Sequence, residues 1–468
     1  MQPSASPPTS RNARQHAVVI GASMGGLLAA RALADYYQQV TVLEQDVFPI
    51  VGDHRKGVPQ SRHAHALLPS GREALEQLFP GLSQALVAQG AILGDSMQDA
   101  VRCISGNYHC RFQSGAQSLY VSRTRLEAQI RLRLLALPNV QAIENCHVMG
   151  VTATADYSHI TGVRLVRRSQ GNTETILTAD LVVDASGRGS HSPAWLEALG
   201  YVIPKEKVQV DIGYVSRIYR RTPGQAQGIY TVLITPAPPN RRMGVMLAIE
   251  DDRWLVTLVG YLGDHAPTDP EGFLAFAKTL PAPDIYAAIH DAEPLSEPVP
   301  AKFPASTRHY YERLTRFPTG YLVFGDAICS FNPSYGQGMS VAALEALALH
   351  RCLTNGMQGL AQRFFAEAGQ LLDNPWTIVI GGDLRFPEVA GKRSPLKPLL
   401  DWYMAKLHRA AQHDRALVLA FNSVAGLRES PKSLLRPQVV WRVLRGNMKT
   451  GLAVKNSSGR IGLFSDAR

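Results

Sequence analysis

The sequence lacks long apolar segments. Its 468 residues are 45% hydrophobic, yet no apolar run approaches the roughly 20 residues that a helix needs to cross a bilayer. The first fifteen residues, MQPSASPPTSRNARQ, contain no apolar block typical of a secretion signal. We therefore expect a cytoplasmic protein in which residues 1–15 form a disordered tail.

Cysteine is scarce and follows no metal-binding pattern. The chain has five cysteines, with no C-x-x-C pair and no histidines at zinc spacing. Such a pattern is typical of reduced, buried thiols in an intracellular protein. We expect no metal site.

An even distribution of charge is also missing. The formal net charge is +10, but residues 391–468 hold 15 of the basic residues and only 4 of the acidic ones, which leaves 33 basic and 34 acidic residues elsewhere. No nucleic-acid recognition motif accompanies this basic region, and we expect no nucleic-acid partner. The leucine spacing in residues 391–468 predicts helices that pack against the rest of the protein and expose a basic face to solvent. Contact with a membrane surface is the alternative.

The segment HAVVIGASMGGLLAARALADYYQQVTVLEQD reads as strand, tight turn, helix and strand. Gly21, Ser23 and Gly26 occupy the three positions of a G-x-G-x-x-G turn, which places phosphates at a helix N-terminus. Serine in the middle position departs from the pattern, although its hydroxyl can donate to phosphate. Glu44 ends the second strand, where a carboxylate accepts from a ribose hydroxyl. This unit predicts a dinucleotide site.

A second glycine-rich stretch, GDAICSFNPSYGQGMS, follows the apolar strand YLVF. Asp326 lies between strand and helix, where its carboxylate can accept from sugar hydroxyls. Pro333, Gly336 and Gly338 form a rigid loop with little side-chain bulk, against which a flat ring can lie. The helix that begins near Met339 directs its free N–H groups at the same place. The stretch predicts close approach of a ligand to main chain.

Three motifs together resemble the FAD-dependent monooxygenases of the aromatic hydroxylase and squalene epoxidase superfamily: GASMGG with VLEQ, DLVVDASGRGS, and YLVFGDAICSFNPSYGQGMSVAALEAL. The resemblance implies FAD as cofactor, with its ribityl chain beside Asp326. By the same resemblance, Arg55, Gly57 and Val58 in RKGV contact the cofactor, and Arg123 reaches its diphosphate or ribityl region. For both arginines a surface salt bridge is the alternative.

The implied fold is α/β: a Rossmann-like, glutathione reductase-type FAD-binding domain interrupted by an antiparallel β-sheet substrate domain, with a C-terminal helical segment. We assign 16–75, 100–200 and 305–390 to the FAD-binding domain, 76–99 and 201–304 to the substrate domain, and 391–468 to the basic helical region. Turn-punctuated β segments from 208 to 262 form the expected substrate wall, with these aromatic and methionine side chains available: Tyr214, Tyr219, Tyr230, Met243 and Met246.

Some features depart from the simpler aromatic hydroxylases. The middle motif reads D-A-S-G-R, which favours a structural role for Asp184, and the W-x-W-x-I-P motif of flavin halogenases is absent. His63 and His65 would share one side of an extended segment, either packing and hydrogen-bonding there or lining a cavity.

The resemblance implies a FAD-dependent monooxygenase that transfers one oxygen atom from O2 through a C4a-hydroperoxyflavin, by epoxidation or hydroxylation. The expected substrate is a bulky hydrophobic metabolite such as a polyketide, terpenoid or aromatic natural product. Electrons come from NADH or NADPH, directly or through a separate flavin reductase. No catalytic side chain stands out. A FAD-dependent dehydrogenase or reductase, and a non-catalytic binding protein that retains the fold, stay open as alternatives.

Overall fold

The computed structural model describes residues 14–49, 53–168, 171, 173–222, 224, 226 and 228–453, with side chains up to residue 448. Of the predicted tail 1–15, residues 1–13 lie outside this description, whereas Arg14 and Gln15 belong to the first strand. Residues 454–468 lie outside it as well. Within the described ranges, no helix is both long enough and apolar enough to pass through a membrane.

A parallel sheet of five strands, ordered β17-β11-β1-β2-β7, forms the centre of the first domain. Its strands are β1 (Arg14–Ile20), β2 (Tyr37–Leu43), β7 (Val140–Ile143), β11 (Leu181–Asp184) and β17 (Tyr321–Val323). Their apolar residues are buried on both faces, as parallel sheets require. The alanine- and leucine-rich helices α1 (Met24–Ala34) and α8 (Gly338–Thr354) pack together in this core. The predicted βαβ unit is therefore present.

Smaller elements complete the first domain. They are α2 (Pro69–Leu78), α3 (Leu82–Val87), α4 (Arg123–Leu135), α5 (Ser192–Ala198), α9 (Leu360–Asp383), the paired strands β3 (Ile92–Asp95) and β6 (Gln117–Tyr120), and the antiparallel sheet of β8 (Cys146–Ala153), β9 (Ile160–Arg167) and β10 (Glu174–Thr178). Single-turn helices are η1 (Pro59–Arg62), η3 (Gly187–Gly189), η4 (Tyr311–Arg313), η5 (Gly325–Ala327) and η6 (Pro333–Tyr335).

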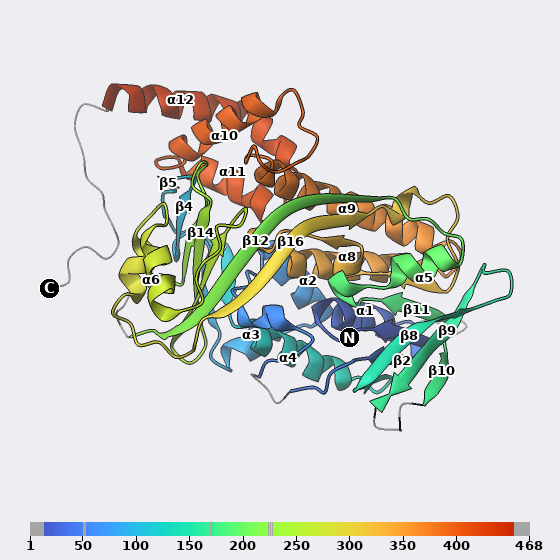
Figure 1. Ribbon diagram of the computed structural model, residues 1–468. Coiled ribbons are helices and arrows are strands. Elements are labelled where there is room, and N and C mark those ends of the chain that lie inside the picture. The colour runs from blue at the N-terminus through green and yellow to red at the C-terminus, as the bar shows by residue number, and fades with distance from the viewer. Residues whose placement is uncertain are drawn as a thin grey trace, which may run out of the picture.

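An eight-stranded, mostly antiparallel sheet forms the second domain, in the order β18-β16-β12-β15-β14-β13-β4-β5. Its strands are β4 (Ala100–Ile104), β5 (Asn107–Tyr108), β12 (Lys205–Arg220), β13 (Thr231–Ile234), β14 (Arg242–Ile249), β15 (Arg253–Gly260), β16 (Val299–His309) and β18 (Cys329–Ser330). Helices α6 (Pro270–Lys278) and α7 (Asp284–Ile289) cover one face. The long strands β12 and β16 run from this sheet toward the first domain (Figure 1).

Two of the domain boundaries expected from the sequence differ from the arrangement of the sheets and helices in the structure. Residues 100–108, assigned to the FAD-binding domain, form β4 and β5 of the second sheet, because β4 pairs in parallel with the distant β13. Residues 82–91, assigned to the substrate domain, contribute α3, whose Leu82 and Leu86 join the core of the first domain. Both differences arise from contacts between segments far apart in the sequence.

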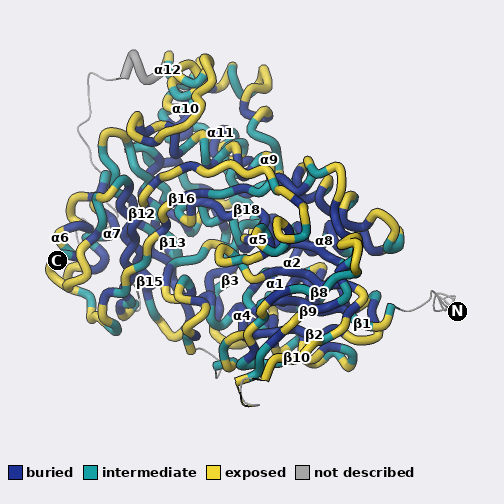
Figure 2. Tube along the Cα trace, turned by 45° about the vertical axis from the view of Figure 1, so that its right-hand side comes forward, coloured by how far each residue is buried: buried dark blue, intermediate teal, exposed yellow. Residues whose placement is uncertain are grey.

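Helices α10 (Lys397–Ala410), α11 (Arg415–Ala425), η7 (Pro431–Leu435) and α12 (Pro437–Ala453) form the C-terminal region. Their apolar residues, which include Tyr403 and Leu407, form a small core together with Met97 and Phe112, and the helices lie above β4, β14 and α9 (Figure 1). Figure 2 shows that α10 and α12 carry many exposed residues, whereas α1 and α8 are mostly buried.

Candidate active site

A cavity of about 1390 Å³ lies between the two sheets and the C-terminal helices. Main chain from both glycine-rich stretches lines one side, including residues 23–25 and 324–326. The substrate sheet lines another side through β13, β14 and β15, and residues from α9 to η7 close the remainder. The cavity exceeds the roughly 300–1,000 Å³ of a typical small-molecule site. It therefore has room for two ligands side by side.

Two helix N-termini open into this cavity. Ser23 is the N-cap of α1 and Gln337 the N-cap of α8, and neither side chain makes a capping hydrogen bond. Both residues line the cavity. The first N–H groups of each helix are thus available to a ligand, and the helix dipoles favour negative charge there. Such an arrangement suits a diphosphate at one end and an electron-rich ring edge at the other.

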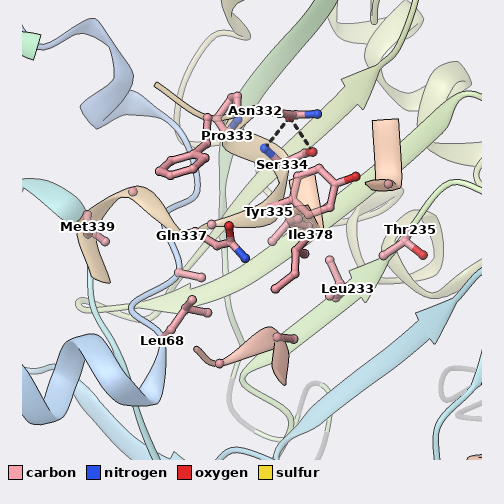
Figure 3. Close-up of a pocket in the computed structure, with 18 of the residues that line it drawn as sticks. Leu68, Leu233, Thr235, Asn332, Pro333, Ser334, Tyr335, Gln337, Met339 and Ile378 are labelled. Atoms are coloured by element: carbon pink, nitrogen blue, oxygen red, sulfur yellow. Dashed lines mark hydrogen bonds between the residues drawn. The ribbon is translucent and has the colours of Figure 1, made fainter. Parts of the chain in front are cut away.

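The loop from Asn332 to Gln337 is held from beneath by buried polar side chains. The Asn332 side chain accepts hydrogen bonds from the Ser334 backbone N–H at 3.0 Å and from the Ser334 hydroxyl at 2.7 Å, as Figure 3 shows. Its Nδ2 donates to Asp383 Oδ1 at 2.8 Å, and the Tyr335 hydroxyl donates to the same oxygen at 3.3 Å. Burial raises the pKa of Asp383 to about 7, although both hydrogen bonds oppose the shift. These contacts fix the loop backbone.

Asp326 projects into the cavity from η5. The residue is exposed to the cavity, but the surrounding protein still raises the pKa of its carboxyl group by partial desolvation, and the positive charges of Arg188 and Arg123 oppose that rise. The backbone N–H of the preceding Gly325 donates to Glu345 Oε2 at 2.8 Å. Burial raises the pKa of Glu345 to about 8. The hydrogen bond to Glu345 thus fixes the turn that carries Asp326, and the Asp326 carboxyl group can accept hydrogen bonds from a ligand in the cavity.

A buried ionic network lies beside the N-terminus of α1. Arg55 Nη1 is 2.5 Å from Glu44 Oε2, and Arg55 Nη2 is 2.7 Å from Glu127 Oε1. Arg123 Nη2 lies 3.0 Å from Glu127 Oε2 and donates to the Ser23 hydroxyl at 2.9 Å. Both arginines thus make ion pairs that are buried, rather than the surface salt bridges that the sequence offered as the alternative. Glu44 also accepts from the backbone N–H of Ala22 and of Asp46, so its contact with a ribose stays a prediction.

The two histidines of the polar loop border the cavity. His63 Nδ1 is 2.8 Å from Ser216 Oγ, and His65 Nδ1 is 2.9 Å from the His63 carbonyl oxygen. Burial lowers the pKa of His63 to about 4 and that of His65 to about 3. Both rings are therefore neutral near pH 7. The two histidines form hydrogen bonds and also line the cavity, so the two alternatives expected from the sequence occur together.

The predicted site residues divide into two groups. The cavity is lined by Ser23, Gly57, Arg123, Asp326, Pro333, Gly336 and Gly338. The other five lie behind its wall: Gly21, Gly26, Glu44, Arg55 and Val58. Gly26 serves backbone packing, because a Cβ there would lie 1.7 Å from the Gly21 carbonyl oxygen. Gly57 likewise allows its N–H to donate to Asp46 Oδ2 at 2.5 Å.

Sequence reasoning missed several residues of the site. Gln337 and Arg188 line the cavity, and each lies within a motif in which the glycines carry the stronger sequence signal. Glu127 and Asp383 carry no local signal, because the elements that bear them reach the site only through tertiary packing. Of the five sheet residues named as available, Tyr214 and Met243 line the cavity. Asp184 accepts hydrogen bonds from three serine hydroxyls, which supports its structural role.

The cavity fits FAD on the chemistry of its walls. Gln337 is 2% exposed, and its Oε1 has no hydrogen-bond partner among the described residues. Gly336 has φ of +66°, and a Cβ on Gly338 would lie 3.7 Å from Asp326 Oδ1, so main chain rather than side chains forms this wall. Two free helix N-termini supply donors for the diphosphate and for the polar edge of the flavin ring.

The comparisons with known proteins agree with this site. Residues 14–367 match the family model described as an FAD binding domain. The chain belongs to this FAD-binding family. Protein Rv3254 of Mycobacterium tuberculosis is 33% identical over 460 residues, which cover 94% of this chain and 95% of that protein.

Two solved structures have the same fold as this family member. The flavin-dependent brominase Bmp2 has a TM-score of 0.65 at 14% identity, covering 94% of this chain and 100% of its own. A probable FAD-dependent monooxygenase, PqsL of Pseudomonas aeruginosa, has a TM-score of 0.57 at 17% identity, covering 87% and 100%. The predicted family resemblance and fold class are confirmed. The protein is a FAD-dependent oxidoreductase with the fold of the flavin-dependent monooxygenases.

Proposed function

We propose that this FAD-dependent enzyme inserts one oxygen atom from O2 into a bulky hydrophobic metabolite, such as a polyketide, terpenoid or aromatic natural product, by epoxidation or hydroxylation. The observation that carries the proposal is the continuity of one cavity from the cofactor wall to the substrate sheet. A molecule in the second part of the cavity would lie against the face of a ring held by residues 333–338. Oxygen transfer requires this direct contact.

The walls of the second part are suited to an apolar substrate. Leu233 of β13 and Val245 of β14 are paired neighbours on the cavity side of the sheet. Opposite them lie Ile378 of α9 and the loop that begins at Pro333 (Figure 3). Burying a bulky hydrocarbon against such surfaces is favourable by about 25 cal/mol per Å² of apolar area removed from water.

The chain contributes orientation, burial and electrostatics to this reaction. When bound, FAD supplies the electron transfer and oxygen chemistry that side chains cannot perform. The N-terminus of α8 stabilises negative charge beside the loop, and Asp326 orients the sugar chain by accepting hydrogen bonds. The C-terminal helices cover part of the cavity and reduce its contact with water. No proton transfer by His63 or His65 is needed for an alkene or other neutral substrate, because such a substrate requires no general base.

The electron donor we propose is NADH or NADPH, acting directly or through a separate flavin reductase. The test uses the FAD-loaded enzyme with each nucleotide in turn, a panel of the three substrate classes, and isotopically labelled dioxygen. We expect oxygen uptake that depends on substrate and one labelled oxygen atom in each product. Nucleotide oxidation with no label in the product would instead identify a dehydrogenase or reductase. If neither nucleotide reduces the flavin, addition of a flavin reductase should restore uptake.

We also propose that the C-terminal helices contact an anionic membrane surface. Leu396, Leu399 and Trp402 on or beside α10 are exposed, as are Trp441 and Met448 on α12, within the region of 15 basic and 4 acidic residues. Leu400 and Leu435 are exposed and also line the cavity. A hydrophobic substrate could then pass from the bilayer into the cavity without crossing water.

A further inference from the structure

The cavity side of the substrate sheet carries one charged residue among its described members. The sheet residues that line the cavity are Arg102 and Ile104, Tyr214, Thr231 and Leu233, Met243, Val245, Leu247 and Ala248, Thr257 and Val259, and Phe303. Arg102 of β4 is paired with Leu233 of β13, which is paired with Val245 of β14. The guanidinium therefore lies at the end of an apolar row that crosses the sheet.

Arg102 forms no ion pair with any residue that the structure describes. The contact of its Nη1 is with Met97 Sδ at 4.0 Å. Burial lowers the pKa of Arg102, and nearby Tyr120 and Asp95 only oppose this shift. Asp95 is itself occupied, because its two oxygens accept hydrogen bonds from the backbone N–H groups of Met97 and Gln98 in the following turn, from the backbone N–H groups of Ser114 and Gly115, and from the Ser114 hydroxyl. A guanidinium stays charged in proteins, and Arg102 is partly buried in the cavity wall without an ion-pair partner, so an anionic group that reaches it from the cavity is favoured.

Three of the other cations that line the cavity differ from Arg102, whereas Arg385, Lys392 and Lys432 likewise have no ion pair among the described residues. Arg123 is paired with Glu127, and Lys397 is paired with Asp401. Arg188 lies with Asp326 on the cofactor side. Each of these three cations has an anionic neighbour or lies on the cofactor side of the cavity. Arg102 instead belongs to the substrate sheet and has no ion-pair partner among the described residues.

The end of the cavity near Arg102 is positively charged. Arg385 donates to the Ser105 hydroxyl at 3.1 Å, three residues beyond Arg102. Between the two arginines lies a stacked histidine pair, with His109 Nε2 3.1 Å from His408 Nδ1. Burial, together with the charges of Arg102 and Arg385, lowers the pKa of His109 to about 4 and that of His408 to about 3. The pair thus adds no charge near pH 7, and the two arginines dominate.

We propose that Arg102 binds an acidic group of an otherwise apolar substrate, and that the enzyme acts on amphipathic anions such as long-chain or polycyclic carboxylic acids. This inference rests on the proposed function, because it takes the second part of the cavity as the substrate site. The apolar row from Leu233 to Val245 holds the hydrocarbon, and the guanidinium fixes one end by a two-pronged hydrogen bond. Such an anchor sets which carbon of the substrate reaches the cofactor.

The test compares two probes of the same skeleton in the FAD-loaded enzyme: anilinonaphthalene sulfonate, an anion, and phenylnaphthylamine, which is neutral. Fluorescence titration gives the Kd of each. We expect the wild type to prefer the anion and Arg102→Met to weaken anion binding by about tenfold or more, the usual loss when a charged hydrogen bond disappears. The neutral probe should bind the variant as it binds the wild type.

Two further variants keep the result interpretable. Arg102→Lys retains the charge and should keep part of the anion preference, with unchanged FAD content and thermal unfolding. Arg164→Met removes one positive charge from the exposed strand β9 and should change neither Kd. The proposal would be overturned if Arg102→Met weakened the binding of both probes equally, or if the wild type did not bind the anionic probe more tightly than the neutral one. Probe binding needs neither oxygen nor reductant, so this outcome is independent of the oxygen-uptake test.

Discussion

Gly325 and Gly25 meet at the wall of the cavity: a Cβ on Gly325 would lie 3.9 Å from the Cα of Gly25. One residue belongs to the late glycine-rich stretch and the other to the first turn of the chain. Gly325 has φ of +67°, which disfavours any side chain. Two turns that are distant in sequence thus form one surface of bare main chain.

Enlarging Gly338 should weaken cofactor binding without harming the fold. A Cβ at this position meets only Asp326 Oδ1, at ordinary contact distance, and alanine favours helix formation over glycine. We expect the FAD-free Gly338→Ala variant to be as stable as the wild type, with lower FAD affinity, and Gly338→Leu to bind FAD more weakly still. Flavin fluorescence titration measures this order. Unchanged affinity in both variants would contradict the predicted position of the cofactor.

Filling the substrate side should separate substrate binding from cofactor binding. Leu233→Trp adds bulk to the apolar row of Leu233 and Val245, which belongs to the substrate sheet and not to the glycine-rich stretches predicted to hold FAD. We expect normal FAD content and at least about a tenfold rise in KM for a bulky substrate, since the new ring occupies its volume. Ile176→Trp on the exposed surface of β10 serves as the control. Loss of FAD from Leu233→Trp would show that the two parts of the cavity are not distinct.

The buried Asp383 should make stability depend on pH. Its folded-state pKa of about 7 lies above that of an unfolded aspartate, so its stabilising contribution is complete at acidic pH and is lost as pH rises toward 7. Asp383→Asn removes this dependence and should gain stability relative to the wild type as pH increases. Urea unfolding at several pH values measures the difference. The exposed Asp291→Asn variant should follow the wild type, and parallel curves for Asp383→Asn would refute the assignment.

Glu127 should be the most sensitive member of the ionic network. Burial raises the pKa of Glu127, but Arg123 and Arg55 outweigh it and hold the pKa below its usual range. Its contribution is therefore present at neutral pH and is lost as pH falls through the lowered pKa. Glu127→Gln leaves two buried arginines without their shared partner and should cost about 3–5 kcal/mol at pH 7. The exposed pair of Arg164 offers a control, since Glu174→Gln should cost about 1 kcal/mol or less.

The membrane proposal predicts binding that depends on lipid charge. We expect the wild type to sediment with vesicles of equal parts phosphatidylglycerol and phosphatidylcholine, and less with phosphatidylcholine alone or at high salt. Replacing Leu399 and Trp441 by serine should reduce sedimentation while leaving FAD content unchanged. Tyr157→Ser, on the exposed turn between β8 and β9, should have no effect. The proposal would be rejected if sedimentation were the same with both lipid compositions, or if the two serine substitutions did not reduce it.

The sequence by itself determined the FAD-binding βαβ unit, both glycine turns and the family. These features are local: hydrophobic periodicity sets strands and helices, and glycine at fixed spacing sets the turns. Only the tertiary structure decided that β4 joins β13 and carries Arg102 to the cavity, that Glu44 pairs with Arg55, and that Asp383 supports the loop at Asn332. Each of these depends on contacts between distant segments, which sequence periodicity does not encode.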